Sequence, residues 1–345
     1  MTGSTESRDG EQGVAGAAGV AAGRRVPDFF IVGHPKSGTT ALYEMLRRHP
    51  QIFMPDLKEP RWFASDLRAR FQPDAQGGGR PPLVPQTYDE YLALFDPATP
   101  SQRVGEASPS YLRSRTAAGL IAEAQPDARI IAVLREPTSF LRSMHLELVQ
   151  NHIETEKDFR AAMANEVIAP AAGEADPAGG APILRYSDRV RYVEQLERFS
   201  AVFPPEQMLV LIYDDFRSDN EATVRRVLRF LGVDDSLPIA AVEANPTVQV
   251  RSLRLDRLVH SLYAGSGPVS RALKATIKLL TPPSWHGEGF QSLRRRMVYG
   301  APPSVDEAYM RELRPRFEAE VRSLSRYLDR DLISEWGYTD APADS

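Results

Sequence analysis

The chain has 345 residues, and its 42 Lys and Arg residues against 46 Asp and Glu residues give a formal net charge of −4. With 42% hydrophobic and 26% charged residues the composition is that of a globular protein, and its slight acidity argues against a dedicated nucleic-acid binder. Cysteine is absent, which excludes disulfides, cysteine-ligated metal centres and a thiol nucleophile. The six histidines form no H-E-x-x-H motif, so we expect no metal site.

Residues 1–26 are rich in Gly, Ala and Ser and lack the basic region and apolar run of a signal peptide. We expect a disordered N-terminal tail, followed by a single domain over residues 27–340. The longest apolar runs are far shorter than the ~18 residues of a membrane span. Without an anchor or cysteine, we expect a cytoplasmic protein, and the Ala, Arg, Gly and Pro bias is compatible with a bacterial one. The oligomeric state is left open.

Three short apolar runs, each followed by an amphipathic segment, predict β-strands that alternate with α-helices. Apolar strands of this kind are typical of a parallel sheet covered on both faces. We therefore expect an α/β protein with three layers, in which helices cover both faces of a central parallel sheet. The expected strands cover 29–32, 129–134 and 208–213. One helix is expected to begin near Thr39 or Thr40, either of which can cap it, and another near Pro137. Further helices are expected over 186–203, over 220–231, where Gly232 ends the helix, and over about 306–328. Segments 72–86 and 165–183 are interpreted as surface loops, and 261–304 is left unassigned.

A loop of mostly small residues joins the first strand to its helix: Gly33-His34-Pro35-Lys36-Ser37-Gly38-Thr39-Thr40. Small residues at this position let several backbone N–H groups converge on an anion, and the N-terminus of the helix adds the positive end of its dipole. The nucleotide motif G-x-x-x-x-G-K-[ST] has the same glycine spacing, but Thr39 stands at its lysine position and Lys36 lies inside the loop. The pattern favours an anion site over a plain turn and weakens the case for an ATPase or GTPase.

This loop resembles the 5′-phosphosulfate loop of the sulfotransferases that use 3′-phosphoadenosine 5′-phosphosulfate (PAPS). A second strand and helix add to the resemblance, because Arg135 closes the strand and Ser143 follows eight residues later. In that family the corresponding arginine and serine hold the 3′-phosphate of PAPS. A guanidinium at a strand end and a hydroxyl about two turns into the next helix can both reach one anion.

The resemblance covers about residues 28–338 and is greatest to the Lys-Glu-Pro branch, which includes heparan-type and many bacterial enzymes. It also includes Leu57-Lys58-Glu59-Pro60, residues 105–112, Tyr186 and its helix, residues 211–216, and Trp336. It implies a P-loop-like fold with PAPS as the co-substrate and no metal. The residues that it implies for PAPS binding are Pro35, Lys36, Ser37, Gly38, Thr39, Thr40, Arg135, Ser143, Tyr213 and Arg251.

The resemblance implies sulfuryl transfer by in-line displacement to an acceptor hydroxyl, in preference to an amine. Lys36 is then placed to stabilise the negative charge of the leaving group. Glu59 matches the catalytic carboxylate of this branch, and a partly dry cleft is expected to raise its pKa toward neutrality. A histidine commonly follows the tripeptide in the branch, whereas this chain has Arg61, so the role of that histidine does not carry over.

Glu106 and His145 are rival candidates for the base. Glu106 lies in the segment that resembles the substrate-side loop, whereas His145 lies two residues past Ser143 and so on another face of the helix, which favours a structural role. Glu147, one turn past Ser143, is a weaker candidate that faces the cleft. On sequence alone, without the family, Glu59 reads as a surface carboxylate paired with Lys58 or Arg61. His34 and His49 are interpreted as loop and helix-end residues, and Arg294-Arg295-Arg296 as a solvent-exposed helix face.

Two other functions remain open. A P-loop kinase or nucleotide hydrolase is the first, and ATP turnover with Mg²⁺ would favour it. A nucleotide-binding regulator without catalysis is the second, and the presence of both Lys36 and Glu59 argues against it. The acceptor, whether a small molecule, a lipid or a saccharide, is not decided by the sequence. We expect neither a nucleic-acid partner nor a membrane span.

Overall fold

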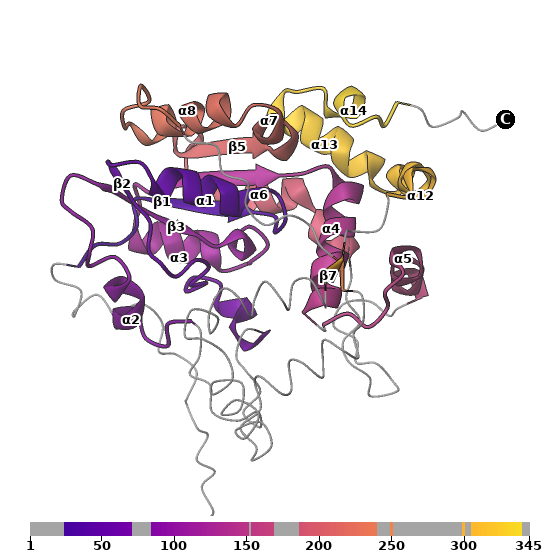
Figure 1. Cartoon of the computed structure of the whole chain (residues 1–345), viewed down its shortest axis with the longest axis horizontal. Coiled ribbons are helices and arrows are strands. Elements are labelled where there is room, and N and C mark those ends of the chain that lie inside the picture. Colours follow the sequence, from indigo (N-terminus) through magenta and orange to yellow (C-terminus); the bar gives the residue numbers. More distant parts are fainter. Residues whose placement is uncertain are drawn as a thin grey trace, which may run out of the picture.

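Five strands form one parallel sheet in the order β2-β3-β1-β4-β5 (Figure 1). The computed structural model describes residues 24–70, 84–151, 153–168, 186–239, 249–250, 299–300 and 305–339. The strands of the sheet are β1 (Phe29–Gly33), β2 (Ile52–Phe53), β3 (Arg103–Ala107), β4 (Arg129–Leu134) and β5 (Met208–Ile212), and a separate antiparallel pair consists of β6 (Gln249–Val250) and β7 (Tyr299–Gly300). The predicted α/β class with a central parallel sheet is confirmed.

Helices follow the strands of the sheet and continue to the end of the described chain (Figure 1). The first group is α1 (Thr39–Arg47), α2 (Tyr88–Ala93), α3 (Ala117–Ala124), α4 (Pro137–Gln150), α5 (Phe159–Ile168) and α6 (Tyr192–Ser200). The second group is α7 (Tyr213–Ser218), α8 (Asn220–Leu231), α12 (Glu307–Leu313), α13 (Glu318–Leu328) and α14 (Leu332–Glu335). The predicted helices at Thr39, Pro137 and 220–231 are confirmed, with Gly232 as the left-handed C-cap of α8.

The two faces of the sheet are covered by different helices, which gives the three layers. Successive residues of β1 alternate between the faces. Phe30 and Val32 belong to a core cluster with residues of α3, α4, α6 and α13. Phe29 and Ile31 belong to a second cluster with residues of α1 and α8. All four side chains are fully buried, which explains why the strand is apolar without interruption.

The sequence patterns misplaced or missed several elements. The expected helix over 186–203 is divided at Arg191, where a 3₁₀ turn (Ser187–Val190) gives way to α6. The expected helix over 306–328 is interrupted by a 3₁₀ turn (Arg314–Phe317) that contains Pro315. β3 was not predicted because Gly105 and Glu106 break its apolar run. α5 overlaps the start of the expected loop over 165–183, and most of that loop and of 72–86 lies outside the described residues.

The strand order reverses between β1 and β4. β1 lies between β3 and β4, and both pairings are parallel. From β1 the chain moves toward β2 and β3, whereas from β4 it moves the other way, toward β5. Ligands of open α/β sheets bind where the strand order reverses, outside the carboxyl ends of the strands. The loops that follow β1 and β4 meet at this point.

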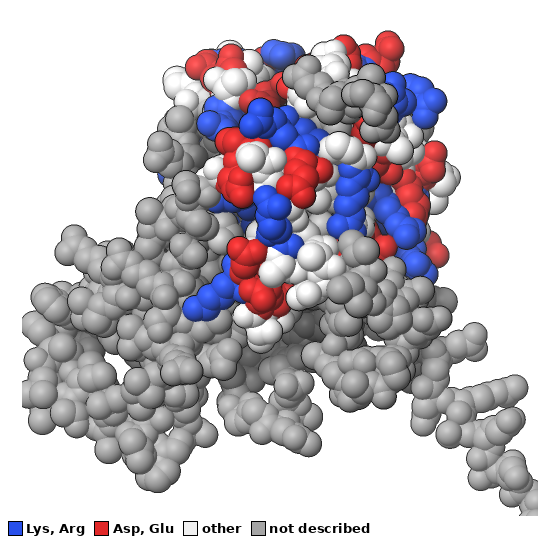
Figure 2. Space-filling model, turned by 90° about the vertical axis from the view of Figure 1, so that its right-hand side faces the viewer, with Lys and Arg blue, Asp and Glu red and all other residues white. Residues whose placement is uncertain are grey.

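Ion pairs join the C-terminal helices to α5. Arg160 of α5 contacts Glu312 (3.0 Å) and Asp306 (3.6 Å), and Arg316 contacts the buried carboxylate of Glu166 (3.2 Å). On the face drawn in Figure 2, acidic and basic side chains of the described residues are interspersed. The exposed pairs of Arg160 contribute little each, whereas the Arg316 pair involves a buried carboxylate. Their effect here is to fix the C-terminal helices beside α4 and α5.

Candidate active site

The loop between β1 and α1 is held in a strained conformation. Lys36 has a φ of 62° and Gly38, the residue that precedes α1, has a φ of 84°. A left-handed φ is uncommon for a residue with a side chain and is found at functional sites. α1 has no side-chain N-cap, which corrects the expectation that Thr39 or Thr40 caps it. Its first N–H groups are therefore available to an anion.

Two glycines bring this loop close to its neighbours. A Cβ on Gly33 would lie 2.3 Å from the carbonyl oxygen of Val133 in β4, so only glycine permits β1 to end so close to β4. A Cβ on Gly38 would lie 2.9 Å from the ring of Phe216 and 3.2 Å from that of Tyr213, both in α7. The two positions explain the glycine spacing of the motif, because each glycine fits the loop against a different neighbouring element.

Arg135 connects the loop after β1 with the start of α4. Its Nη1 donates to the carbonyl oxygen of Lys36 (2.8 Å), and its Nη2 donates to the hydroxyl of Ser139 (2.6 Å). Its guanidinium also lies 4.7 Å from the centre of the Tyr213 ring, a cation–π contact. The structure thus brings together Lys36, Arg135 and Tyr213 from three separate stretches of sequence. Ser139 was not among the predicted site residues, although its spacing of four from Arg135 is a usable signal.

Two buried serines of the predicted site have hydroxyls without a hydrogen-bond partner among the described residues. Ser37 in the loop is 0% exposed, and Ser143 in α4 is 3% exposed. Buried hydroxyls are normally hydrogen-bonded, because an unmade bond costs about 1–3 kcal/mol. Ser37 follows Lys36, and Ser143 lies one turn after Ser139, the partner of Arg135. One unpartnered hydroxyl is therefore adjacent in sequence to Lys36, and the other lies one helical turn from the residue that Arg135 contacts.

Glu59 is held between two cations. Its Oε1 lies 2.8 Å from the Nζ of Lys58, and its Oε2 accepts a hydrogen bond from Arg61. Burial alone would raise the pKa of Glu59, but the attraction of Lys58 and Arg61 outweighs it and lowers the pKa below its ordinary value. The expectation that the pKa of Glu59 is raised toward neutrality is therefore wrong, because the effect of the two neighbouring cations exceeds the effect of burial.

The backbone of this segment is fixed to β3. Glu59 and Arg61 have φ values of 62° and 56°, so three of the four non-glycine residues with positive φ among the described residues, counting Lys36, belong to the candidate site. The Glu59 N–H donates to the carbonyl oxygen of Ala107 (3.0 Å), and the Arg61 N–H donates to the Ser108 hydroxyl (3.1 Å). The end of β3 thus sets the position of Glu59.

Glu106 lies behind the Glu59 segment and is fully buried. Its Oε2 accepts hydrogen bonds from the hydroxyls of Tyr91 (2.7 Å) and Tyr111 (3.1 Å). Burial raises the pKa of Glu106 to about 7, against the opposing effect of the Ser108, Tyr91 and Tyr111 hydroxyls. The carboxyl group faces these tyrosines in the core, which argues against contact with an acceptor.

Glu147 of α4 faces the same group of charges as Glu59. Burial raises its pKa, while the positive charge of Lys36 lowers it and the negative charge of Glu59 raises it. Lys58 and Arg61 also act on it. Glu147 is therefore close enough to charged residues of both loops to interact with them electrostatically.

The histidines have structural surroundings. His34 is buried between the rings of Phe140 and Tyr192 and is hydrogen-bonded to Gln195 (3.2 Å), and burial lowers its pKa to about 3. His145 is buried, contacts the Phe159 ring and lies 2.9 Å from the carbonyl oxygen of Glu156. His49 lies 2.8 Å from the carbonyl oxygen of Asp234. These contacts support the structural interpretation of all three and argue against His145 as the base.

Some predicted residues lie outside the described residues, namely Arg251 and Arg294-Arg295-Arg296. The described part of the chain holds no cluster of three or more His, Asp or Glu side chains suited to a metal ion. None of the helices within the described ranges is both long and apolar enough to span a membrane.

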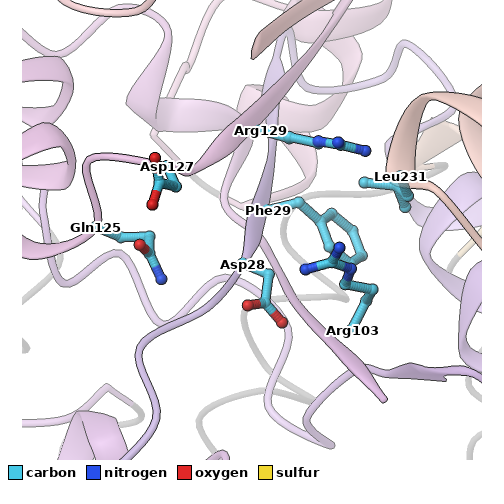
Figure 3. Close-up of a pocket in the computed structure, with 7 residues that line it drawn as sticks. All are labelled: Asp28, Phe29, Arg103, Gln125, Asp127, Arg129 and Leu231. Atoms are coloured by element: carbon cyan, nitrogen blue, oxygen red, sulfur yellow. The ribbon is translucent and has the colours of Figure 1, made fainter. Parts of the chain in front are cut away.

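A pocket of about 300 Å³ lies at the opposite edge of the sheet (Figure 3). It is lined by Asp28, Phe29, Arg103, Gln125, Asp127, Arg129 and Leu231. Most of these residues lie at or just before the amino ends of β1, β3 and β4. The pocket is therefore separated from the candidate site by the length of the strands, and it contains none of the predicted site residues.

Comparison with known proteins identifies relatives over most of the chain. A family model described as "Sulfotransferase family" matches residues 27–236. Carbohydrate sulfotransferase 15 of Mus musculus is 28% identical over 254 residues, which cover 61% of this chain and 44% of that protein. Heparan sulfate glucosamine 3-O-sulfotransferase 3B1 of Mus musculus is 26% identical over 234 residues, which cover 67% of this chain and 52% of that protein. The chain spans about half the length of these curated relatives.

A solved structure supports the same relationship. The crystal structure of a sulfotransferase from Alicyclobacillus acidocaldarius aligns with a TM-score of 0.53 and 29% identity, covering 72% of this chain and 96% of that one. The family model covers more than half of this chain. It includes the five strands of the sheet and the loops that carry Lys36, Glu59, Arg135 and Tyr213. The chain therefore belongs to the sulfotransferase family.

Proposed function

We propose that this protein transfers a sulfuryl group from PAPS to a hydroxyl group of an acceptor, in preference to an amine. The proposal rests on the family and on the groups gathered at the carboxyl edge of the sheet. Two cations, Lys36 and Arg135, lie at the uncapped N-terminus of α1. That combination suits a ligand with more than one phosphate or sulfate group.

The residues at this edge fit PAPS, as the two unpartnered serine hydroxyls indicate. In our proposal the loop from Pro35 to Thr40 holds the 5′-phosphosulfate through its backbone N–H groups and the Ser37 hydroxyl. Arg135 and the Ser143 hydroxyl hold the 3′-phosphate, and the Tyr213 ring supports the guanidinium of Arg135. Arg251 is proposed as a further 3′-phosphate contact.

When bound, PAPS supplies an activated sulfuryl group whose bond to the 5′-phosphate oxygen breaks as the acceptor oxygen bonds to sulfur. Negative charge then develops on the departing phosphate. Lys36 and the N–H groups of the loop stabilise that charge, and a donor in this role typically contributes about 3 to 4 kcal/mol to catalysis. The bond from Arg135 to the Lys36 carbonyl oxygen holds the backbone of the loop in place before the reaction, which limits the reorganisation required during it.

Glu59 is proposed as the base that accepts the proton of the acceptor hydroxyl. Its lowered pKa keeps the carboxylate ionised at neutral pH, which is the form that accepts a proton. Lys58 and Arg61 lower its basicity, and each carboxylate oxygen keeps a second lone pair that can accept from the acceptor hydroxyl. Glu147 faces the same region and is the second candidate.

The acceptor is proposed to be a saccharide hydroxyl, with a small-molecule hydroxyl as the alternative. The support is the names of the relatives, a carbohydrate sulfotransferase and a heparan sulfate glucosamine 3-O-sulfotransferase. The chain matches about half of each relative.

The observation that carries the proposal is the bond from Arg135 to the Lys36 carbonyl, which joins the two anion-binding loops into one site. Calorimetric titration with adenosine 3′,5′-bisphosphate in EDTA tests it without knowledge of the acceptor. We expect tight binding without a metal ion. A parallel titration with ATP and Mg²⁺ tests the kinase or nucleotide hydrolase alternative. Binding of ATP with Mg²⁺, without binding of the bisphosphate, would overturn the proposal.

A further inference from the structure

The segment from Arg330 to Tyr338, which we call the C-terminal segment, contacts the residues that follow β4 and β5. The Tyr338 hydroxyl donates to Oε1 of Glu136 (2.7 Å). The indole N–H of Trp336 donates to Oδ2 of Asp214 (3.1 Å). In Figure 1 the yellow C-terminal helices lie beside α7. The C-terminal segment thus contacts both the residue that precedes α4 and the first turn of α7.

Both contacts fall next to residues of the proposed PAPS site. Glu136 directly follows Arg135, and Asp214 directly follows Tyr213. A third contact is close by, because Arg330 pairs with Asp215 through both of its terminal nitrogens (2.5 and 2.8 Å). The C-terminal segment therefore contacts residues that are adjacent in sequence to Arg135 and to Tyr213, whose ring lies against the Arg135 guanidinium.

A continuous series of hydrogen bonds leads from Tyr338 to the guanidinium of Arg135. The carboxylate of Glu136 accepts from the Tyr338 hydroxyl and also from the N–H of Ser139 (2.7 Å) at the start of α4. The Ser139 hydroxyl in turn accepts from Arg135 at Nε (3.0 Å) and Nη2 (2.6 Å). Glu136 is buried, and its oxygens are satisfied by these donors together with the N–H (3.0 Å) and the hydroxyl (3.0 and 2.9 Å) of Thr138.

Tyr338 and Trp336 are themselves fixed by burial, with 5% and 6% of their surface exposed. Burial and the Glu136 carboxylate raise the pKa of Tyr338, so its hydroxyl keeps its proton and donates at every physiological pH. The Tyr192 hydroxyl holds the other side of this turn by donating to the carbonyl oxygen of Arg135 (2.8 Å). The orientation of Arg135 thus depends on groups from α6 and from the C-terminal segment.

We propose that Tyr338 is a positioning residue that orients Arg135, through Glu136 and Ser139, for the 3′-phosphate of the nucleotide. This inference rests on the proposed function. Tyr338 does not touch the nucleotide in this arrangement. Its contribution is selective for ligands with a 3′-phosphate, since Arg135 is the group that it orients.

The test compares two nucleotides that differ in the 3′-phosphate. Adenosine 3′,5′-bisphosphate and adenosine 5′-monophosphate are titrated into the unchanged full-length protein and into Tyr338→Phe. We expect Tyr338→Phe to bind the bisphosphate about tenfold more weakly, with a clearly smaller loss for the monophosphate, because Arg135 is proposed to contact the 3′-phosphate directly and reaches the 5′ loop only through the Lys36 carbonyl oxygen. Tyr327→Phe is the matched control, because the Tyr327 side chain lies at the surface of α13 and its variant should bind both nucleotides normally.

The outcomes separate this inference from the proposed function. If the unchanged protein does not bind the bisphosphate, the proposed function is wrong and the inference with it. If it binds, and Tyr338→Phe binds the bisphosphate equally well or loses both nucleotides to the same extent, the inference alone is wrong. Should Tyr338→Phe fail to fold, Glu136→Gln replaces it: it keeps the side-chain shape, exchanges one of the two oxygens that accept from Tyr338 and Ser139 for an amide nitrogen, and should give the same selective loss.

Discussion

The contact between β1 and β4 at Gly33 makes the substitution Gly33→Ala a test of the site's framework. Gly33 pairs with Val133 at the last position of β1, and it has a φ of 133°. An alanine there must adopt a backbone conformation that residues with side chains rarely adopt. Its Cβ would also lie 2.3 Å from the oxygen and 2.7 Å from the nitrogen of Val133.

The expected cost follows from these two effects. The unfavourable φ costs about 1–2 kcal/mol. To restore a normal contact distance the two strands must separate by roughly 1 Å. That movement weakens the bond from the His34 N–H to the Val133 carbonyl oxygen (3.0 Å), and a buried bond lost in this way costs about 1–3 kcal/mol. We therefore expect Gly33→Ala to lower the free energy of unfolding by about 2–5 kcal/mol.

Urea denaturation followed by circular dichroism measures this change. Gly119→Ala is the control, because a Cβ on Gly119 meets nothing within 4 Å and the residue lies inside α3. This control should gain about 0.5–1 kcal/mol, since alanine favours a helix over glycine. A Gly33→Ala variant within about 0.5 kcal/mol of the unchanged protein would refute the close approach of the two strands.

Three further predictions concern the charged groups of the site. Lys36→Ala should reduce sulfuryl transfer from radiolabelled PAPS at least about 10²-fold, and near-normal transfer would show that Lys36 does not stabilise the leaving group. Arg61→Gln should raise the pKa of Glu59 and so move the acidic limb of the kcat/KM profile to higher pH; an unmoved limb would exclude Glu59 as the base. Glu106 has a pKa of about 7 in the folded protein, above its ordinary value of 4.5, so the folded state binds the proton more tightly. Stability should therefore fall as pH rises from about 4.5 to 7, by on the order of 3 kcal/mol, and Glu106→Gln should remove this dependence in denaturation measured across that range.

The sheet and the anion-binding loop could be predicted because their signals are local. β1, β4 and β5 are apolar runs, and each lies between core residues of two faces, so burial and sequence agree. The loop from Gly33 to Thr40 is recognisable because its glycines are required by contacts with β4 and α7. Lys36, Arg135 and Tyr213 come together as predicted because all follow the carboxyl ends of parallel strands.

Other features depended on contacts between distant segments. β3 was missed because Glu106 interrupts it, and the distant hydroxyls of Tyr91 and Tyr111 help to make that buried carboxyl acceptable in the core. The pKa of Glu59 was expected to move in the wrong direction because local sequence does not show that Lys58 and Arg61 both turn toward it. The bond between Tyr338 and Glu136 spans 202 positions and has no local signal at all.

In the proposed PAPS site, the buried hydroxyls of Ser37 and Ser143 would place ligand recognition in competition with folding. Neither has a partner among the described residues, so each lowers the stability of the free protein by about 1–3 kcal/mol relative to a site that is internally satisfied. Alanine at either position would make the unliganded protein more resistant to heat and would weaken its hold on anions. A screen that selects only for thermal resistance will therefore tend to select against these two serines, and with them the site itself.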